Sequence, residues 1–183
     1  SRGLQFAAKH AEVQFAARGS AEGMKKYRKV LNEAMKLQGR TRADFKVMWG
    51  VNVIVDETLE GARAKQEALR SMVSMDGALA LMSGHFNYDL SQLPPDEPIG
   101  SLQTDGIQGI VDMVTQDFGQ EVTLRDAALR YGSGVGIVTV IGTPSMVADK
   151  LEELYDVAEG DGFNLLTQHL PGSIDDIVEL LVP

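Results

Sequence analysis

One segment restricts the fold of this chain more than any other: the eleven residues FKVMWGVNVIV at positions 45–55. They are nearly all apolar and rich in β-branched side chains, which is typical of a strand covered on both faces in a parallel sheet. Parallel strands need crossover connections between them, and these are usually helices. We therefore expect an α/β fold, with further strands and helices on either side of this segment.

The residues before this strand predict a helix, a strand and a second helix. Residues 1–10 fit a short amphipathic helix, and AEVQFAA at 11–17 fits a buried strand. The segment 20–38 begins with the helix-capping residue Ser20, repeats its apolar residues every three or four positions, and stops at Gly39. The first 55 residues thus alternate helix, strand, helix, strand.

The end of the chain repeats this alternation. A short β-branched run at 137–141 predicts a strand, and Thr143 with Pro144 suits the first turn of a helix that continues to residue 158. A strand at 162–167 and a final helix at 174–181 follow. Residues 1–183 are expected to form a single domain.

Residues 57–142 lie between the two alternating parts and are expected to form an insertion. A helix is predicted at 58–73, and residues 74–82 either continue it or begin another. Prolines 94, 95 and 98 predict a long irregular loop over 84–105, followed by short helices at 107–118 and 123–131. The stretch GSGVG at 132–136 lacks the spacing of the dinucleotide fingerprint, so we interpret it as a hinge or tight turn.

Composition excludes several classes of function. The chain has no cysteine, which excludes disulfides and thiolate zinc sites, and its acidic pairs have no histidine at metal-ligand spacing. The net charge is -9, and the basic residues near the N-terminus suit the solvated face of one helix better than a nucleic-acid site. No apolar run approaches the roughly 20 residues that cross a bilayer, and no signal peptide is evident, so we expect a cytoplasmic protein.

Three stretches together resemble one known family. They are SRGLQFAAKHAEVQFA at 1–16, VNVIVDETLEGARAKQEAL at 51–69, and IGTPSMVADKLEELYDVAEGDGFNLL at 141–166. The third stretch carries the most specific pattern, with Gly-Thr-Pro, Val-Ala-Asp and Asp-Gly-Phe. The chain resembles the C-terminal portion of bacterial luciferase-like, FMN-dependent monooxygenases of the nitrilotriacetate and dibenzothiophene-sulfone monooxygenase group.

This resemblance implies a fold and a reaction. The chain would supply part of a β/α (TIM-type) barrel, about its last three strands, with 57–142 as a large helical insertion over the mouth. Family members bind reduced FMN, supplied by a separate flavin reductase, and insert one oxygen atom from O2 into a small organic substrate. Because a partial barrel exposes apolar edges, we also expect a homo-oligomer.

The resemblance also suggests site residues, although it assigns no catalytic one. Ser1, Arg2 and Gly3 would form the FMN-phosphate edge at a helix N-terminus; the alternative is an ordinary helix cap. His85 and Tyr88 are candidates for closing a flavin or substrate pocket from the long loop, the alternative being an exposed loop histidine.

Gln168 and His169 follow the last strand, at the face where barrel enzymes place their chemistry. Ordinary loop polarity is the alternative interpretation of this pair. His85 and His169 are the two candidates for a catalytic role.

Two other functions are compatible with the same residues. One is a non-catalytic, self-assembling α/β relative of the family. The other is a deazaflavin-dependent or pyrimidine-oxygenase-like member of the wider superfamily. Fold similarity does not distinguish these functions, because substrate contacts lie in variable loops.

Overall fold

A computed structural model describes residues 2–99, 104–119 and 121–182 and contains a four-stranded parallel sheet. The strands are β1 (Val13–Ala16), β2 (Lys46–Val55), β3 (Thr139–Gly142) and β4 (Gly162–Leu166). Every pairing in the sheet is parallel. The prediction of a mixed α/β fold with parallel strands is confirmed.

The long strand β2 is the centre of this sheet. Along one edge, β1 pairs with its first four residues and β3 pairs with its last four. The N–H groups of Lys46 and Asn52 donate to these neighbours, and residues an even number apart in a strand point to the same edge. β4 pairs with residues 48–52 along the other edge. A single strand therefore holds the three shorter ones in register.

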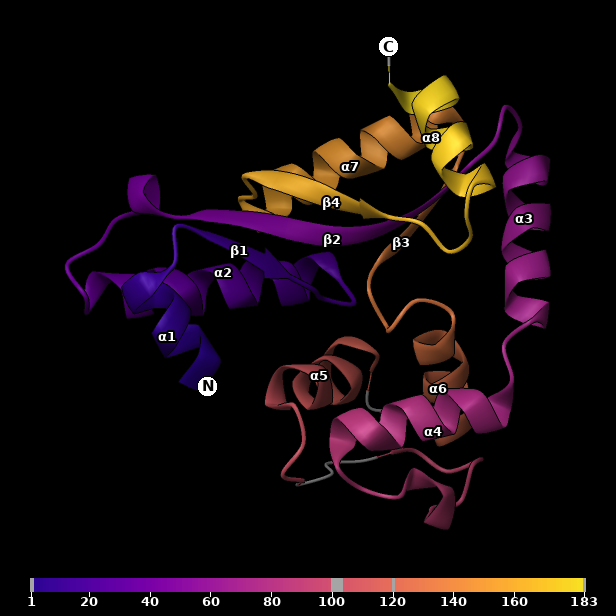
Figure 1. Cartoon of the computed structure of the whole chain (residues 1–183), viewed down its shortest axis with the longest axis horizontal. Coiled ribbons are helices and arrows are strands. Elements are labelled where there is room, and N and C mark those ends of the chain that lie inside the picture. The colour runs from indigo at the N-terminus through magenta and orange to yellow at the C-terminus, as the bar shows by residue number, and fades with distance from the viewer. Residues whose placement is uncertain (1, 100–103, 120, 183) are drawn as a thin grey trace.

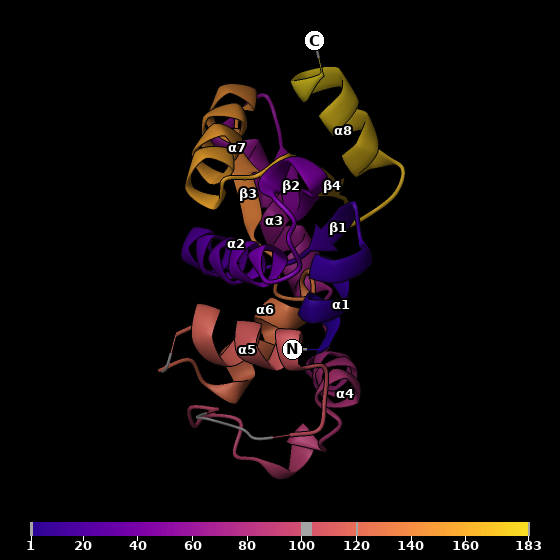
Figure 2. The ribbon, with the colours of Figure 1, turned by 90° about the vertical axis from the view of Figure 1, so that its left-hand side faces the viewer.

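Four helices flank the sheet: α1 (Arg2–His10), α2 (Ala21–Lys36), α7 (Pro144–Ala158) and α8 (Gly172–Leu181). Figure 2 shows α2 and α7 on the same side of the strands. The starts of α2 and α7 were predictable from local chemistry. The Ser20 hydroxyl accepts a hydrogen bond from the Gly23 N–H at 3.0 Å, and the Thr143 hydroxyl caps α7, which begins with Pro144.

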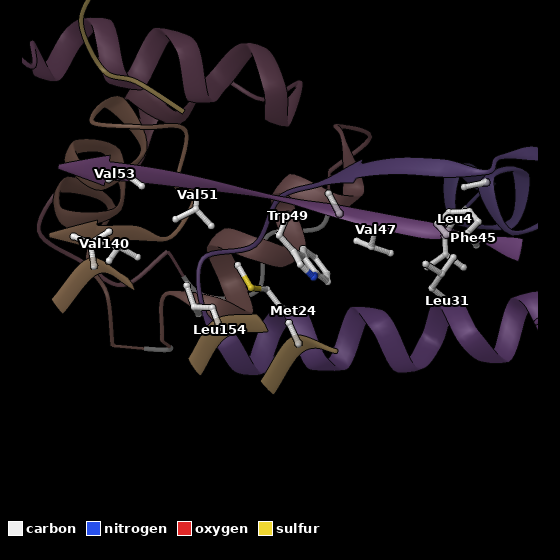
Figure 3. Close-up of a cluster of buried hydrophobic side chains, with 14 of the residues drawn as sticks. Leu4, Met24, Leu31, Phe45, Val47, Trp49, Val51, Val53, Val140 and Leu154 are labelled. Atoms are coloured by element: carbon white, nitrogen blue, oxygen red, sulfur yellow. The ribbon is translucent and has the colours of Figure 1, made fainter. Parts of the chain in front are cut away.

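The odd-numbered residues of β2 form the main hydrophobic core together with α2 and α7 (Figure 3). Trp49 is completely buried, and its ring meets that of Tyr27 edge-on at 5.9 Å. Met24 and Leu31 of α2 and Leu154 of α7 are buried in the same core. Residues 47, 49, 51, 53 and 55 thus account for one face of the largely apolar run that predicted β2.

The opposite face of the sheet is only partly covered. Phe15 and Met48 are register partners, so they share this face with Gly50, against which the Phe15 ring packs. Val13 and Phe15 are 59% and 50% exposed. Further along β2, Asn52 and Ile54 on the same face are buried. The uncovered part therefore lies at the N-terminal half of the strands.

The segment between β2 and β3 folds as a largely helical unit with its own core (Figure 1). Its helices are α3 (Leu59–Ser71), α4 (Met75–Phe86), α5 (Gln108–Asp112) and α6 (Leu124–Gly132), with short turns at Leu90–Gln92 and Met113–Asp117. Phe86, Leu90, Leu124 and Tyr131 are at most 1% exposed. Among the described residues, no helix is long and apolar enough to cross a membrane.

The structure corrects two predictions within this segment. Residues 84–86 belong to α4 and not to a loop, because the helix continues until Asn87 takes the left-handed conformation that closes it. The helix expected at 107–118 is α5 followed by a π-helical turn. Ser74 caps α4 as a separate helix. GSGVG is a turn, as predicted, with positive φ at Val135 and Gly136.

Candidate functional site at the carboxyl ends of the strands

A cavity of about 410 Å³ lies where three strands end. Its floor includes Gly19 after β1, Ile54 near the end of β2 and Gln168 after β4. Residues of α3 and α6 form the opposite wall. Cavities of this size suit small-molecule ligands, and the carboxyl ends of parallel strands are the usual place for them.

A second cavity, of about 360 Å³, adjoins the first, because Ile54 and Leu69 line both. Its wall is mostly apolar and includes an ion network centred on Lys65. The Lys65 Nζ lies 2.9 Å from a carboxylate oxygen of Asp56 and 2.7 Å from one of Asp176. The hydrogen bond from Lys65 and that from the Thr58 N–H lower the pKa of Asp56. This network joins the end of β2 to α3 and α8.

Two carboxamides hold the turn before β3 against the floor of the first cavity. Asn52 is 4% exposed and donates to the Gly134 oxygen at 3.3 Å. Gln168 donates to the Ser133 oxygen. A Cβ on Gly134 would lie 2.4 Å from the Asn52 Nδ2, so this close approach requires glycine or a shift of Asn52. The turn is therefore fixed to β2 and to the end of β4.

A carboxylate joins the insertion to the start of α2. The Gly19 N–H donates to Asp117 at 3.2 Å, and the carboxylate lies against Gly23 in the first turn of α2. Burial raises the pKa of Asp117, which outweighs the lowering effect of this hydrogen bond and of nearby cations. A helix N-terminus favours a negative charge, so the contact is electrostatically matched. The insertion is thereby attached beside the first cavity.

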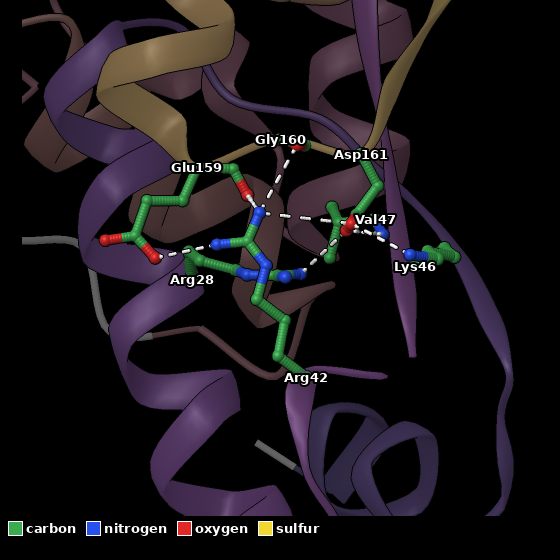
Figure 4. A network of polar contacts seen from close by, with 7 residues as sticks. All are labelled: Arg28, Arg42, Lys46, Val47, Glu159, Gly160 and Asp161. Carbon is green, nitrogen blue, oxygen red and sulfur yellow. Dashed lines mark hydrogen bonds and ion pairs between the residues drawn. The ribbon is translucent and has the colours of Figure 1, made fainter. Parts of the chain in front are cut away.

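The other end of the sheet carries a different polar network (Figure 4). Arg28 of α2, 2% exposed, lies 3.2 Å from Asp161, and Arg42 and Lys46 approach the same carboxylate from the surface. Burial lowers the pKa of Arg28, and Asp161 opposes this shift. Asp161 also accepts the Val47 N–H at 2.9 Å. Because the side chains of Arg28 and Asp161 are both buried and pair with each other, we assign this network a structural role.

The predicted phosphate residues lie at the start of α1. Arg2 and Gly3 are exposed in its first turn, whereas Ser1 lies outside the described residues. No acidic side chain occupies that turn, and the space beside Gly3 is open. In Figure 1, α1 is inclined to the strands and its N-terminus lies below the sheet.

The predicted loop residues His85 and Tyr88 lie in the insertion and line neither of these two cavities. His85 lies in α4, where its Nδ1 is 2.5 Å from the hydroxyl of Tyr131. Burial raises the pKa of Tyr131 to about 12. Tyr88 follows the end of α4 and is 40% exposed. The structure therefore does not bring these two residues together with Gln168.

Gln168 and His169, in contrast, lie at the carboxyl end of β4, as predicted, but line different cavities. Gln168 faces the first cavity, and His169 lines the second. The His169 Nδ1 is 2.8 Å from the Ser173 hydroxyl in α8. The two neighbouring residues thus contact different parts of the site.

Sequence reasoning missed several residues of the first cavity. Arg70 and Gln66 of α3 and Arg130 of α6 line it, and nothing in their local sequence separates them from solvated helix residues. Asn52 did leave a signal, because it is a polar residue in the middle of an otherwise apolar strand. Such a residue needs hydrogen-bond partners when buried, and these partners locate the turn before β3.

Residues 1–158 match the luciferase-like monooxygenase family. The chain belongs to this family. Over 184 residues it is 33% identical to the dimethyl-sulfide monooxygenase of Hyphomicrobium sulfonivorans, covering 100% of this chain and 38% of that protein. It is 31% identical to nitrilotriacetate monooxygenase component A of Aminobacter aminovorans, covering 99% and 41%.

Solved structures of this family superpose on the whole chain. DmoA from Hyphomicrobium sulfonivorans gives a TM-score of 0.81 at 31% identity, covering 100% of this chain and 39% of the other. A riboflavin lyase with modified FMN and riboflavin gives 0.84 at 25% identity, covering 100% and 40%. The luciferase-like chain thus spans well under half the length of the relatives it matches.

Proposed function

We propose that this chain forms the last three strands of a β/α-barrel monooxygenase that binds reduced FMN and inserts one oxygen atom from O2 into a small organic substrate. The observation that carries the proposal is the cavity at the carboxyl ends of β1, β2 and β4 in a chain of this family. The insertion 57–142 forms part of its wall. The uncovered face with Val13 and Phe15 fits the inside of a barrel whose other strands lie elsewhere in a longer protein.

The residues at the start of α1 fit a flavin phosphate. The N–H groups of Arg2 and Gly3 and the Arg2 guanidinium are suitable donors, and the first turn of α1 holds no acidic side chain to repel an anion. Bound FMN would supply the oxygen chemistry, while the protein binds and orients it. The name "component A" of the nitrilotriacetate enzyme supports a second component, which we propose is the flavin reductase.

A titration of flavin fluorescence in the complete protein tests this proposal. We expect saturable binding of FMN, and an Arg2→Ala variant should bind FMN about tenfold more weakly while its affinity for riboflavin stays the same. Lys9→Ala, at the other end of α1, is the matched control and should behave as the wild type. A complete protein that binds no flavin, oxidised or reduced, would disprove the proposed function.

The exposed apolar face favours a second candidate, a non-catalytic relative that assembles with copies of itself. Such a protein would bury Val13 and Phe15 against a second chain. Sedimentation of this chain distinguishes the two candidates. A strictly monomeric chain counts against self-assembly, and a homo-oligomer without flavin affinity counts against the monooxygenase.

His85, Tyr88, Gln168 and His169 are the proposed contacts to flavin or substrate. Of these, Gln168 and His169 have the stronger support, because they line the two adjoining cavities. A deazaflavin cofactor is a further alternative, and the titration with FMN addresses it directly.

A further inference from the structure

Several polar side chains that line the first cavity already donate hydrogen bonds to other groups of the protein. Arg130 donates to the Gly19 oxygen at 3.0 Å, and its guanidinium lies 4.0 Å above the ring of Phe118. Gln168 donates to the oxygen of Ser133. These contacts fix the loops around the cavity, so these donors have little remaining capacity to bind a ligand.

Two side chains on α3 line the same cavity but have no such hydrogen-bond partners among the described residues. Gln66 and Arg70 line the cavity together with Leu69, and residues 66, 69 and 70 lie on one face of a helix. Within the part of the chain that the structure describes, neither the Gln66 carboxamide nor the Arg70 guanidinium has a hydrogen-bond or ion-pair partner. A guanidinium offers five N–H donors in a planar fork that matches a carboxylate or another oxyanion.

The charge of the cavity favours the same kind of ligand. Arg70 and Arg130 contribute two positive charges, and Asp126 contributes one negative charge. The Asp126 carboxylate accepts a hydrogen bond from the Thr123 hydroxyl at 2.9 Å, in the first turn of α6, where the helix end stabilises it. Among the described residues that line it, the cavity therefore has an excess of one positive charge, and Arg70 is the cation without a protein partner.

Apolar side chains provide a place for the rest of a ligand. Ile54, Leu69 and Leu129 line the same cavity, beside the free donors. A site of about 410 Å³ that combines an apolar wall with a few convergent donors suits a small organic molecule with one charged end. Arg70 is exposed, so a neutral gas or an unbranched hydrocarbon would leave its guanidinium bound to water alone.

We propose that this cavity receives the oxyanion group of a small organic substrate, with Arg70 and Gln66 as the residues that determine specificity. The inference rests on the proposed function, because it names the substrate class of that site. The oxyanion could also belong to the flavin phosphate, which we place at Arg2 instead. The experiment separates these two sources.

The test measures two affinities in the complete protein: that for FMN, by flavin fluorescence, and that for acetate, succinate and methanesulfonate, by calorimetry with FMN present. We expect at least one of these anions to bind, its uncharged amide to bind at least tenfold more weakly, and Arg70→Gln to weaken anion binding about tenfold or more. Arg70→Lys should restore part of the loss, because it keeps the charge without the planar fork. The FMN affinity should be unchanged in both variants.

Arg63→Gln is the matched control. Arg63 lies on the same helix and is exposed, but it is not part of the cavity wall, so the same change of net charge should leave anion binding within about twofold. Equal losses in Arg63→Gln and Arg70→Gln would overturn the proposal, because the effect would then be a general charge effect.

Three further outcomes are informative. Absence of binding by all three anions overturns the substrate class. A loss of FMN affinity in Arg70→Gln with riboflavin unaffected also overturns it, since Arg70 would then hold the flavin phosphate. A protein that binds no flavin disproves the proposed function but not the anion site. Anion binding that depends on Arg70 would still support an anion site in this cavity.

Discussion

The sheet and the helical insertion bury their apolar residues in different ways. In the insertion, helices α4 and α6 close around Phe86, Leu90, Leu124 and Tyr131, and these side chains are almost inaccessible to solvent. In the sheet, one face of β2 is packed by α2 and α7, whereas Phe15 on the other face is half exposed. The insertion completes its own core, while one face of the sheet is left partly uncovered by this chain.

This difference makes a general point about inserted segments. A unit that closes its own core can be carried by a scaffold that is itself incomplete, because the two need little shared apolar surface. Here polar contacts between them include Asp117 to Gly19 and Lys26 to Gln116. The following predictions test how far the two regions are independent.

The largest effect is expected in the core of the sheet. Trp49→Ala should reduce the free energy of unfolding by about 4 kcal/mol, because it removes a fully buried indole and leaves a cavity under Tyr27. Urea denaturation followed by circular dichroism measures this loss. Phe6→Ala, at a ring that is 67% exposed, is the control and should cost no more than about 0.5 kcal/mol. Similar losses in both variants would contradict the proposed core.

Asp161→Asn should cost about 3 kcal/mol, because it leaves the Arg28 guanidinium buried without its ion pair. Glu153→Gln removes the exposed pair with Lys150 and should change stability by less than about 0.5 kcal/mol. Thermal unfolding of both variants measures the contrast. If Asp161→Asn is neutral, the network at the amino-terminal end of the sheet does not stabilise this region.

Leu124→Ala should cost about 2 kcal/mol, near the lower end of the usual range, because the small insertion can partly relax around the lost side chain. Hydrogen exchange measured by residue locates the effect. We expect faster exchange in α4 and α6 and unchanged exchange in β2. Equal acceleration in β2 would show that the two regions unfold as one unit.

Asp117→Asn tests the contact between the insertion and the start of α2, through the pH dependence of stability. Because burial raises the pKa of Asp117, the stability that it contributes is complete below its unfolded pKa and is lost as pH rises through the higher folded value. The variant should therefore match the wild type in acid and gain relative stability as pH rises to neutrality. Urea midpoints over this pH range measure the change. A relative stability that falls with pH would contradict the raised pKa.

The smallest effect on stability is expected on the open face. Phe15→Ser should change the free energy of unfolding of this chain by at most about 0.5 kcal/mol, because the ring is half exposed. It should nevertheless reduce self-association, which sedimentation velocity measures. Unchanged association would show that this face is not where the isolated chain pairs.

Sequence reasoning succeeded where the signal is local. Ser20, Thr143 and Pro144 mark helix starts through bonds within one turn, and the apolar run at 45–55 identifies the central strand without knowledge of its neighbours. Each of these features depends on residues that are neighbours in the sequence. The resemblance to the family, carried by three quoted stretches, was confirmed as well.

The candidate site was less accessible to the same reasoning. His85 was expected in a loop, but its partner Tyr131 is 46 residues away and only the folded insertion brings them together. Arg70 and Gln66 resemble any solvated helix residues until the position of α6 is known. A site built from elements distant in sequence leaves no periodic signal along the chain.

The register at the end of β2 has a practical consequence. Val55, where the chain leaves the sheet, is the strand partner of Gly142, where it returns. The two ends of the intervening segment, residues 56–141, are thus held side by side by the sheet, and the entropy of closing this loop increases only slowly with its length. The segment should therefore be exchangeable between relatives. Chimaeras joined at Val55 and Gly142 should keep the sheet and replace one wall of the cavity as a unit.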